Sequence, residues 1–163
     1  MKPYTKLRPF LVLFALVLLL AACGGGDAEP AAESPGSADS ATVGTLTIEG
    51  AWARPPAMAG GNGAAYFTVR NDGDTADRLI AVSSPLAMAE MHESVMAEDG
   101  TMSMNPVAGV DIPPNGSVEF KRGGLHIMFM GITEPPAVGD TVSLTLTFQN
   151  AGDVTLDLPV REE

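Results

Sequence analysis

Turn-forming residues recur at near-regular intervals from residue 44 onward and divide this part of the chain into short segments. The segments between them are rich in Val, Leu, Thr and Phe, and the clearest one, residues 142–148, alternates apolar and polar residues. We find no amphipathic helix of ten or more residues. Short strands at such spacing are typical of a two-sheet sandwich or a barrel. The turn signals are Asn71-Asp72-Gly73, Glu98-Asp99-Gly100, Pro113-Pro114-Asn115-Gly116 and Asn150-Ala151-Gly152-Asp153.

The pattern predicts one all-β domain over residues 44–163, a β-sandwich of about eight or nine strands. This length is enough for a hydrophobic core. The candidate strands are Thr45–Ala53, Ala64–Asn71, Arg78–Ser83, Glu90–Met96, Thr101–Val107, Ser117–Lys121, Leu125–Gly131, Thr141–Gln149 and Val154–Val160.

The N-terminal segment has the organisation of a lipoprotein signal peptide over residues 1–22. Three basic residues precede an apolar run from Phe10 to Leu20, which is short for a membrane span. The run ends in Leu20-Ala21-Ala22-Cys23, which resembles a bacterial lipobox. In such signals the cysteine becomes the lipidated N-terminus, so we expect Cys23 to carry a membrane anchor. Cys23 is the only cysteine, and the chain therefore has no internal disulfide.

Residues 23–43 contain mostly Gly, Ala, Ser, Pro and acidic residues, and we expect them to form a flexible acidic tether after the lipidated cysteine. Removal of the signal leaves 6 basic against 20 acidic residues, a net charge of −14. Such a charge argues against nucleic-acid binding and does not favour docking on anionic lipid.

Histidine and methionine are unevenly distributed along the chain. Both histidines, and six of the nine methionines, lie between Met91 and Met130, with the spacing His92-x11-Met104-x21-His126-x-Met128. Imidazole and thioether donors form a soft, uncharged set that favours Cu(I), whereas a closed Zn²⁺ site uses thiolate, imidazole or carboxylate. The leading hypothesis is therefore a Cu(I) site.

The period of a β-strand supports this hypothesis. In the segment 125–130, His126, Met128 and Met130 alternate with three apolar residues, so they share one strand face about 7 Å apart while the others face the core. In the segment 89–96, His92 is expected to project away from the core and Met91 to pack inward. Nearby acidic residues are interpreted as a solvated rim, namely Glu90, Glu93 and Glu98.

The spacing leaves alternatives open for the methionines. Met102 and Met104 share a face if their segment is extended, so spacing does not choose between them. A lone methionine is usually adaptable core filler. We assign that role to Met58, Met88 and Met91, and the same role is favoured for Met96, Met102 and Met130.

Several motifs together resemble the PCu(A)C family of periplasmic copper chaperones, over most of residues 45–160. They are Gly50-Ala51-Trp52-Ala53-Arg54-Pro55-Pro56, Ala65-Tyr66-Phe67-Thr68-Val69-Arg70-Asn71, Asp77-Arg78-Leu79, Met91-His92-Glu93, Met104-Asn105-Pro106-Val107 and Gly124-Leu125-His126-Ile127-Met128-Phe129-Met130-Gly131.

The resemblance implies a cupredoxin-like, Greek-key β-sandwich that binds Cu(I) and takes part in copper supply to the CuA centre of cytochrome c oxidase. It implies His92, Met104, His126 and Met128 as the metal ligands, and the residues after Met104 favour it over Met102. It also implies an apo oxidase copper subunit, or another copper carrier, as partner. The segment between His92 and Met104 is a residue longer than in many members of the family.

We therefore expect a monomeric, membrane-anchored copper chaperone in the periplasm or on the outer face of the cell membrane. Electron transfer is disfavoured, because blue copper sites need a Cys ligand and Cys23 lies outside the domain. An enzyme is not expected, since no Ser-His-Asp set can be identified. The alternatives are a copper-buffering or resistance protein without a dedicated recipient, and a structural β-sandwich whose Met/His cluster is packing.

Overall fold

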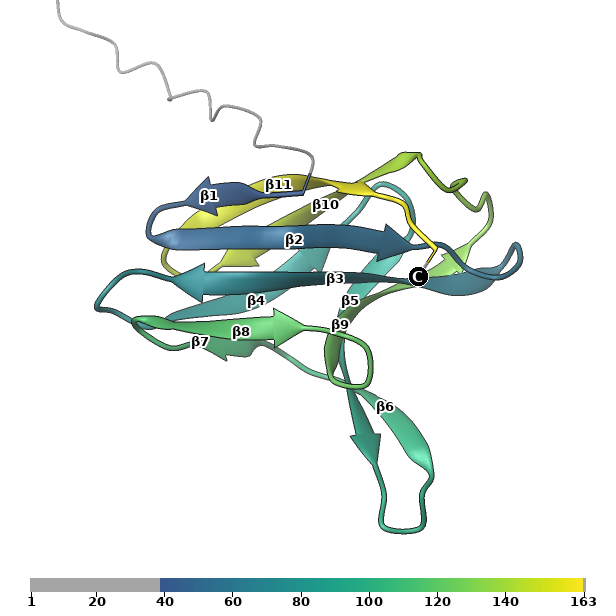
Figure 1. Cartoon of the computed structure of the whole chain (residues 1–163), viewed down its shortest axis with the longest axis horizontal. Coiled ribbons are helices and arrows are strands. Elements are labelled where there is room, and N and C mark those ends of the chain that lie inside the picture. The colour runs from purple at the N-terminus through teal and green to yellow at the C-terminus, as the bar shows by residue number, and fades with distance from the viewer. Residues whose placement is uncertain (1–38, 163) are drawn as a thin grey trace, which may run out of the picture. The chain divides into compact units, whose positions relative to one another are not determined.

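The structure, a computed structural model, describes residues 39–162, and these form two antiparallel β-sheets without a helix (Figure 1). Their eleven strands are Ala41–Val43 (β1), Leu46–Arg54 (β2), Gly61–Asn71 (β3), Asp77–Ser83 (β4), Met88–Met96 (β5), Met102–Pro106 (β6), Val110–Ile112 (β7), Gly116–Phe120 (β8), Leu125–Ile132 (β9), Thr141–Phe148 (β10) and Gly152–Pro159 (β11).

The larger sheet has seven strands in the order β1-β2-β3-β9-β5-β6, and β8 pairs with the second half of β3. Strands distant in sequence are neighbours, because β9 lies between β3 and β5. Such an order is that of a Greek-key sandwich rather than a meander. The smaller sheet has the order β11-β10-β4-β7. The all-β sandwich predicted from the sequence is confirmed.

The core lies between the two sheets and is filled by alternate residues of each strand. Ile127 and Phe129 of β9 are buried there, as the alternation in residues 125–130 predicted. Leu144 and Leu146 of β10 face them from the smaller sheet's side of the core, where neither has accessible surface. The outward face of β9 is thereby fixed as well, since a one-residue slip would place this apolar set in solvent.

The nine predicted strands are all present, and the structure adds β1 and β7. Both have only three residues, which is too short for an alternating pattern to be recognised. Strand β1 pairs with β2 through Ala41–Ile48 and Val43–Leu46, so residues 41–43, which we assigned to the tether, belong to the sheet. The signal peptide, Cys23 and residues 24–38 lie outside the described residues.

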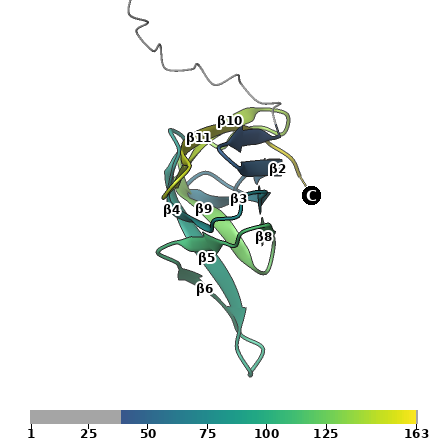
Figure 2. The same ribbon diagram turned by 90° about the vertical axis from the view of Figure 1, so that its left-hand side faces the viewer.

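The hairpin of β5 and β6 extends beyond the rest of the sandwich, as two perpendicular views agree (Figures 1 and 2). Strand β6 is the edge of the larger sheet, and each of its five residues is exposed. The turn at the hairpin tip closes through a hydrogen bond from Ala97 N to Thr101 O, and Gly100 supplies the positive φ of 82° that the turn requires. No helix in residues 39–162 is long and apolar enough to span a bilayer.

Candidate metal centre

Three adjacent strands of the larger sheet bring the predicted ligands to one face. His92 of β5 lies directly opposite His126 of β9, and Met104 of β6 lies opposite Ser94 of β5. Directly opposed residues of antiparallel strands share a face, and so do residues two apart on one strand. His92, Met104, His126 and Met128 therefore all project from the same face, opposite to the face that packs in the core.

The two imidazole rings are neighbours on this face. Their centroids lie 6.0 Å apart with an interplanar angle of 39°. Both side chains are buried, with exposed fractions of 7% for His92 and 5% for His126. The prediction that His92 projects away from the core and Met91 packs inward is correct in direction, because Met91 is part of the core cluster. His92 is nevertheless shielded from solvent on its own face.

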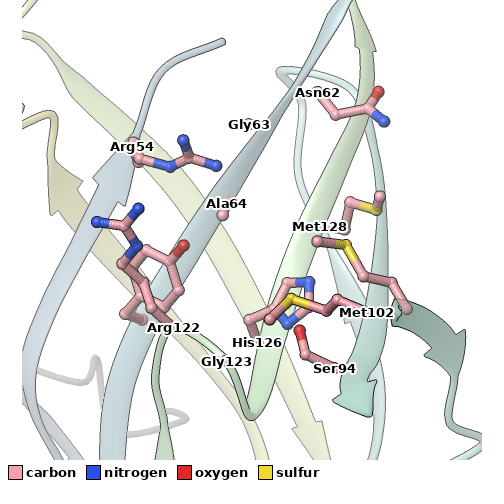
Figure 3. Close-up of a pocket in the computed structure, with 12 residues that line it drawn as sticks. Arg54, Asn62, Gly63, Ala64, Ser94, Met102, Arg122, Gly123, His126 and Met128 are labelled. Carbon is pink, nitrogen blue, oxygen red and sulfur yellow. The ribbon is translucent and has the colours of Figure 1, made fainter. Parts of the chain in front are cut away.

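A cavity of about 390 Å³ opens beside these residues. His126, Met104 and Met128 line it, together with Met102 (Figure 3). His92 does not line it and lies on the same face across from His126. The remaining lining residues are Arg54, Asn62, Gly63, Ala64, Tyr66, Ser94, Arg122 and Gly123.

The hydrogen bonds of His126 define which of its nitrogens is free. Its Nδ1 lies 3.0 Å from the carbonyl oxygen of Gly124. A carbonyl oxygen can only accept, so Nδ1 carries the proton and donates it. In the neutral ring the lone pair is then on Nε2, the nitrogen available to a metal. An outer hydrogen bond of this kind is the usual way in which a ligating histidine is oriented.

In His92 it is the other ring nitrogen, Nε2, that makes the hydrogen bond. Its Nε2 lies 3.2 Å from Oε2 of Glu90, and the carboxylate accepts the Nε2 proton. The lone pair is therefore on Nδ1. That atom is buried and has no hydrogen-bond partner, and it is the sole such side-chain atom among the residues described. A buried acceptor without a partner is costly, and a metal ion would satisfy it.

The donor set around the cavity suits a soft ion. Residues 39–162 contain no group of three or more His, Cys, Asp or Glu that could hold a metal, so a metal held on this face would depend on thioethers. Thioether ligands favour Cu(I). Among residues 39–162 no carboxylate lines the cavity, and two arginines, Arg54 and Arg122, stand across it from Met128 and His126 (Figure 3). This charge pattern disfavours hard divalent cations, which need anionic oxygen ligands.

Two features of the site were not predicted from the sequence. Glu90 was assigned to a solvated rim, but it contacts His92, and its position two residues earlier on the same strand was a usable signal. Arg122 was not singled out, because it follows β8 in sequence and reaches the cavity only through the fold.

Tyr66 lies against Trp52, with ring centroids 4.8 Å apart, and Tyr66 also lines the cavity.

Several methionines differ from their predicted packing role. Met91 is buried in the core, as predicted. Met58 and Met88 are exposed, so their assignment to packing was wrong, and the packing role favoured for Met96 and Met102 is wrong as well. Met58 lies in the loop between β2 and β3, and Met88, Met96 and Met102 lie on parts of β5 and β6 whose outward face is open to solvent, unlike the shielded face at His92.

Solved structures that contain bound copper are similar to this chain in sequence and fold. The copper-bound PCuAC domain from PmoF2 is 30% identical to this chain, with a TM-score of 0.65 over 76% of this chain and 98% of that domain. The solution structure of CuI-DR1885 from Deinococcus radiodurans is 27% identical, with a TM-score of 0.55 over 77% of this chain and 83% of that one.

The family model described as "Putative lipoprotein LpqE-like" matches residues 46–160. A curated relative, "Putative lipoprotein Lxx21020" of Leifsonia xyli subsp. xyli (strain CTCB07), is 30% identical over 118 residues, which are 72% of this chain and 70% of the relative. The chain therefore belongs to the LpqE-like family and is of the PCu(A)C type, with a cupredoxin-like β fold. The resemblance and the fold class inferred from the sequence are both confirmed.

Proposed function

We propose that this chain is an extracytoplasmic Cu(I)-binding metallochaperone, and that His92, Met104, His126 and Met128 are its ligands, which we call the inner site. The observation that carries the proposal is that the buried Nδ1 of His92 has no hydrogen-bond partner. His92 lies on the same sheet face as a second imidazole and two thioethers. The copper-bound and Cu(I)-bound relatives support the choice of metal.

In the proposed complex each histidine binds through the nitrogen that its own hydrogen bond leaves free, Nδ1 of His92 and Nε2 of His126. The thioethers of Met104 and Met128 complete the set. All four donors are neutral, and no thiolate is present in residues 39–162 to support a blue copper centre. The site is therefore suited to carrying Cu(I) rather than to transferring electrons.

Release is proposed to proceed by ligand exchange from the open side of the site. The two histidines are buried, whereas Met104 lies on the exposed edge strand β6 with 53% of its surface accessible. A donor from a recipient protein can therefore replace Met104 first while the histidines still hold the ion. One exposed, replaceable ligand beside two buried ones distinguishes a carrier from a closed structural site.

We propose an apo copper subunit of cytochrome c oxidase, or another copper carrier, as recipient, on the basis of the family resemblance. The test is transfer from the Cu(I)-loaded chain to an apo CuA domain, followed by the absorption of the assembled centre. We expect transfer faster than that from an equally tight small-molecule Cu(I) chelator. Copper that moves no faster than from the chelator would instead indicate a buffering or resistance protein.

Glu90 is expected to act as a positioning residue for His92. Replacing Glu90 by alanine should weaken Cu(I) binding by about tenfold, the lower end of the range for outer partners of metal ligands, because the carboxylate is half-exposed. The same variant should shift the ¹⁵N signals of apo His92 away from the Nε2–H tautomer. Replacing Glu93, whose side chain lies on the opposite face of β5, is the matched control. An unchanged tautomer in Glu90→Ala would contradict the assignment.

Cys23 is proposed to anchor the chain to a membrane through a lipid. The Cys23→Ser variant should fold and bind Cu(I) like the original chain but should leave the membrane fraction, because the lipid supplies the attachment. The measurement is membrane fractionation after a high-salt wash, with mass spectrometry of the N-terminus. A Cys23→Ser chain that still sediments with membranes would contradict the lipoprotein proposal.

A further inference from the structure

Two methionines near the tip of the β5–β6 hairpin have no packing role. Met96 and Met102 are 63% and 52% exposed, yet each is a large apolar side chain on a strand that projects from the sandwich (Figures 1 and 2). Both could be replaced by polar residues without loss of a core contact.

The register of the hairpin places the two sulfurs on the face of the inner site. Met96 lies directly opposite Met102, so the two side chains start from facing positions about 5 Å apart at Cβ. The next pair on the same face toward the body of the sandwich is Ser94 with Met104. Met102 also lines the cavity with Met104, Met128 and His126. The outer methionine pair, Met96 and Met102, is thus continuous with the inner site.

The hairpin tip beyond this pair carries negative charge. The turn contains Glu98 and Asp99, and both side chains are exposed. The backbone N–H of Thr101 donates to Oδ1 of Asp99 at 2.9 Å, and this bond lowers the pKa of Asp99, with a side-chain hydrogen bond from Thr101 adding to it. The tip therefore stays anionic and attracts a monovalent cation toward the hairpin, in contrast to the cavity wall formed by Arg54 and Arg122.

We propose that Met96 and Met102 form an outer Cu(I) site through which copper enters the inner site. Two exposed thioethers bind Cu(I) more weakly than the four inner donors, which suits a transit position. Copper passes inward when the thioether of Met104 replaces that of Met96 while Met102 still holds the ion. Each step forms one copper–sulfur bond and breaks another, and copper stays Cu(I). This inference rests on the proposed function of the inner site.

The test compares two double variants of the full chain that each lack two exposed sulfurs. Met96→Leu with Met102→Leu removes the outer pair, and Met58→Leu with Met88→Leu is the control. These exchanges nearly conserve volume, so both variants should fold, which thermal melting verifies. We expect the outer-pair variant to take up Cu(I) from a chelator complex about tenfold more slowly than the control variant. Variants of one interface change their association rates over a range that includes this factor. The affinity of the outer-pair variant at equilibrium should change less than threefold.

Methyl-labelled methionine NMR gives an independent readout. The first equivalent of Cu(I) should shift the methyl signals of Met104 and Met128, and excess Cu(I) should then shift those of Met96 and Met102. Equal loading rates in the two double variants would overturn the outer site and leave the proposed function standing. An affinity loss in the outer-pair variant as large as that of Met128→Leu would also overturn it, because Met102 would then be an inner ligand. A chain that binds no Cu(I) at all would overturn both proposals.

Discussion

Replacing His126 by glutamine is expected to weaken Cu(I) binding by at least about 100-fold. Loss of an outer partner of a metal ligand already costs about 10- to 100-fold, and His126→Gln removes a ligand itself. The side chain is buried beside His92, and its free Nε2 is held in place by the Nδ1–H bond to Gly124. Glutamine can keep a hydrogen bond to that carbonyl but supplies no imidazole. The measurement is competition for Cu(I) against a chelator of known affinity.

The control for His126→Gln is Ser94→Ala. Ser94 lines the same cavity and faces the same way but carries no soft donor, so its replacement should leave the affinity within about threefold. Thermal melting of both apo variants separates lost copper binding from lost folding. Equal affinities for His126→Gln and the original chain would remove His126 from the site and would leave the unpartnered Nδ1 of His92 unexplained.

Replacing Met128 by leucine is expected to weaken Cu(I) binding by at least about tenfold, which corresponds to about 1.4 kcal/mol. Leucine fills nearly the same volume, so the free energy of unfolding should change by less than about 1.5 kcal/mol. The soft sulfur donor is lost, however, and nothing else changes in the cavity. Chelator competition again gives the affinity.

Met91→Leu is the matched control for Met128→Leu. Met91 is on the neighbouring strand β5, opposite Ile127, and its side chain is buried on the core face of the same sheet. Both variants remove one sulfur, so an effect of total sulfur content would reduce copper affinity equally in both. A ligand role predicts a loss in Met128→Leu alone. A loss in Met91→Leu as large as that in Met128→Leu would contradict the assignment.

Much of the fold could be predicted because its signals are local. Alternation over seven residues, as in β10, and a turn signal on either side are enough to define a strand. Strands β1 and β7 gave no such signal, because three residues do not establish a period and β1 lies in a stretch of small residues. The pairing of β9 with both β3 and β5 could not be derived from pattern, since these contacts join distant segments.

The candidate site, like the fold, was predictable where its signals are local and not where it depends on contacts between distant segments. His126 and Met128 belong together by strand period alone, and the sequence predicted that pair directly. That His92 lies opposite His126 depends on the register between β5 and β9, which is decided by core packing across the whole sheet. The roles of Nδ1 and Nε2 depend on Glu90 and Gly124, whose contacts appear only in three dimensions. Exposure of Met88 was mispredicted for a similar reason, because no local pattern reports which strand face stays uncovered.

We propose above all that two imidazoles and two thioethers of one sheet face hold Cu(I). Copper K-edge X-ray absorption of the chain loaded with one equivalent of Cu(I) tests it most directly, because nitrogen and sulfur neighbours scatter differently. The proposed site predicts both kinds of neighbour, and it predicts a smaller sulfur contribution when Met104 and Met128 are both replaced by leucine. A spectrum without sulfur neighbours, or one unchanged in that double variant, would contradict the claim.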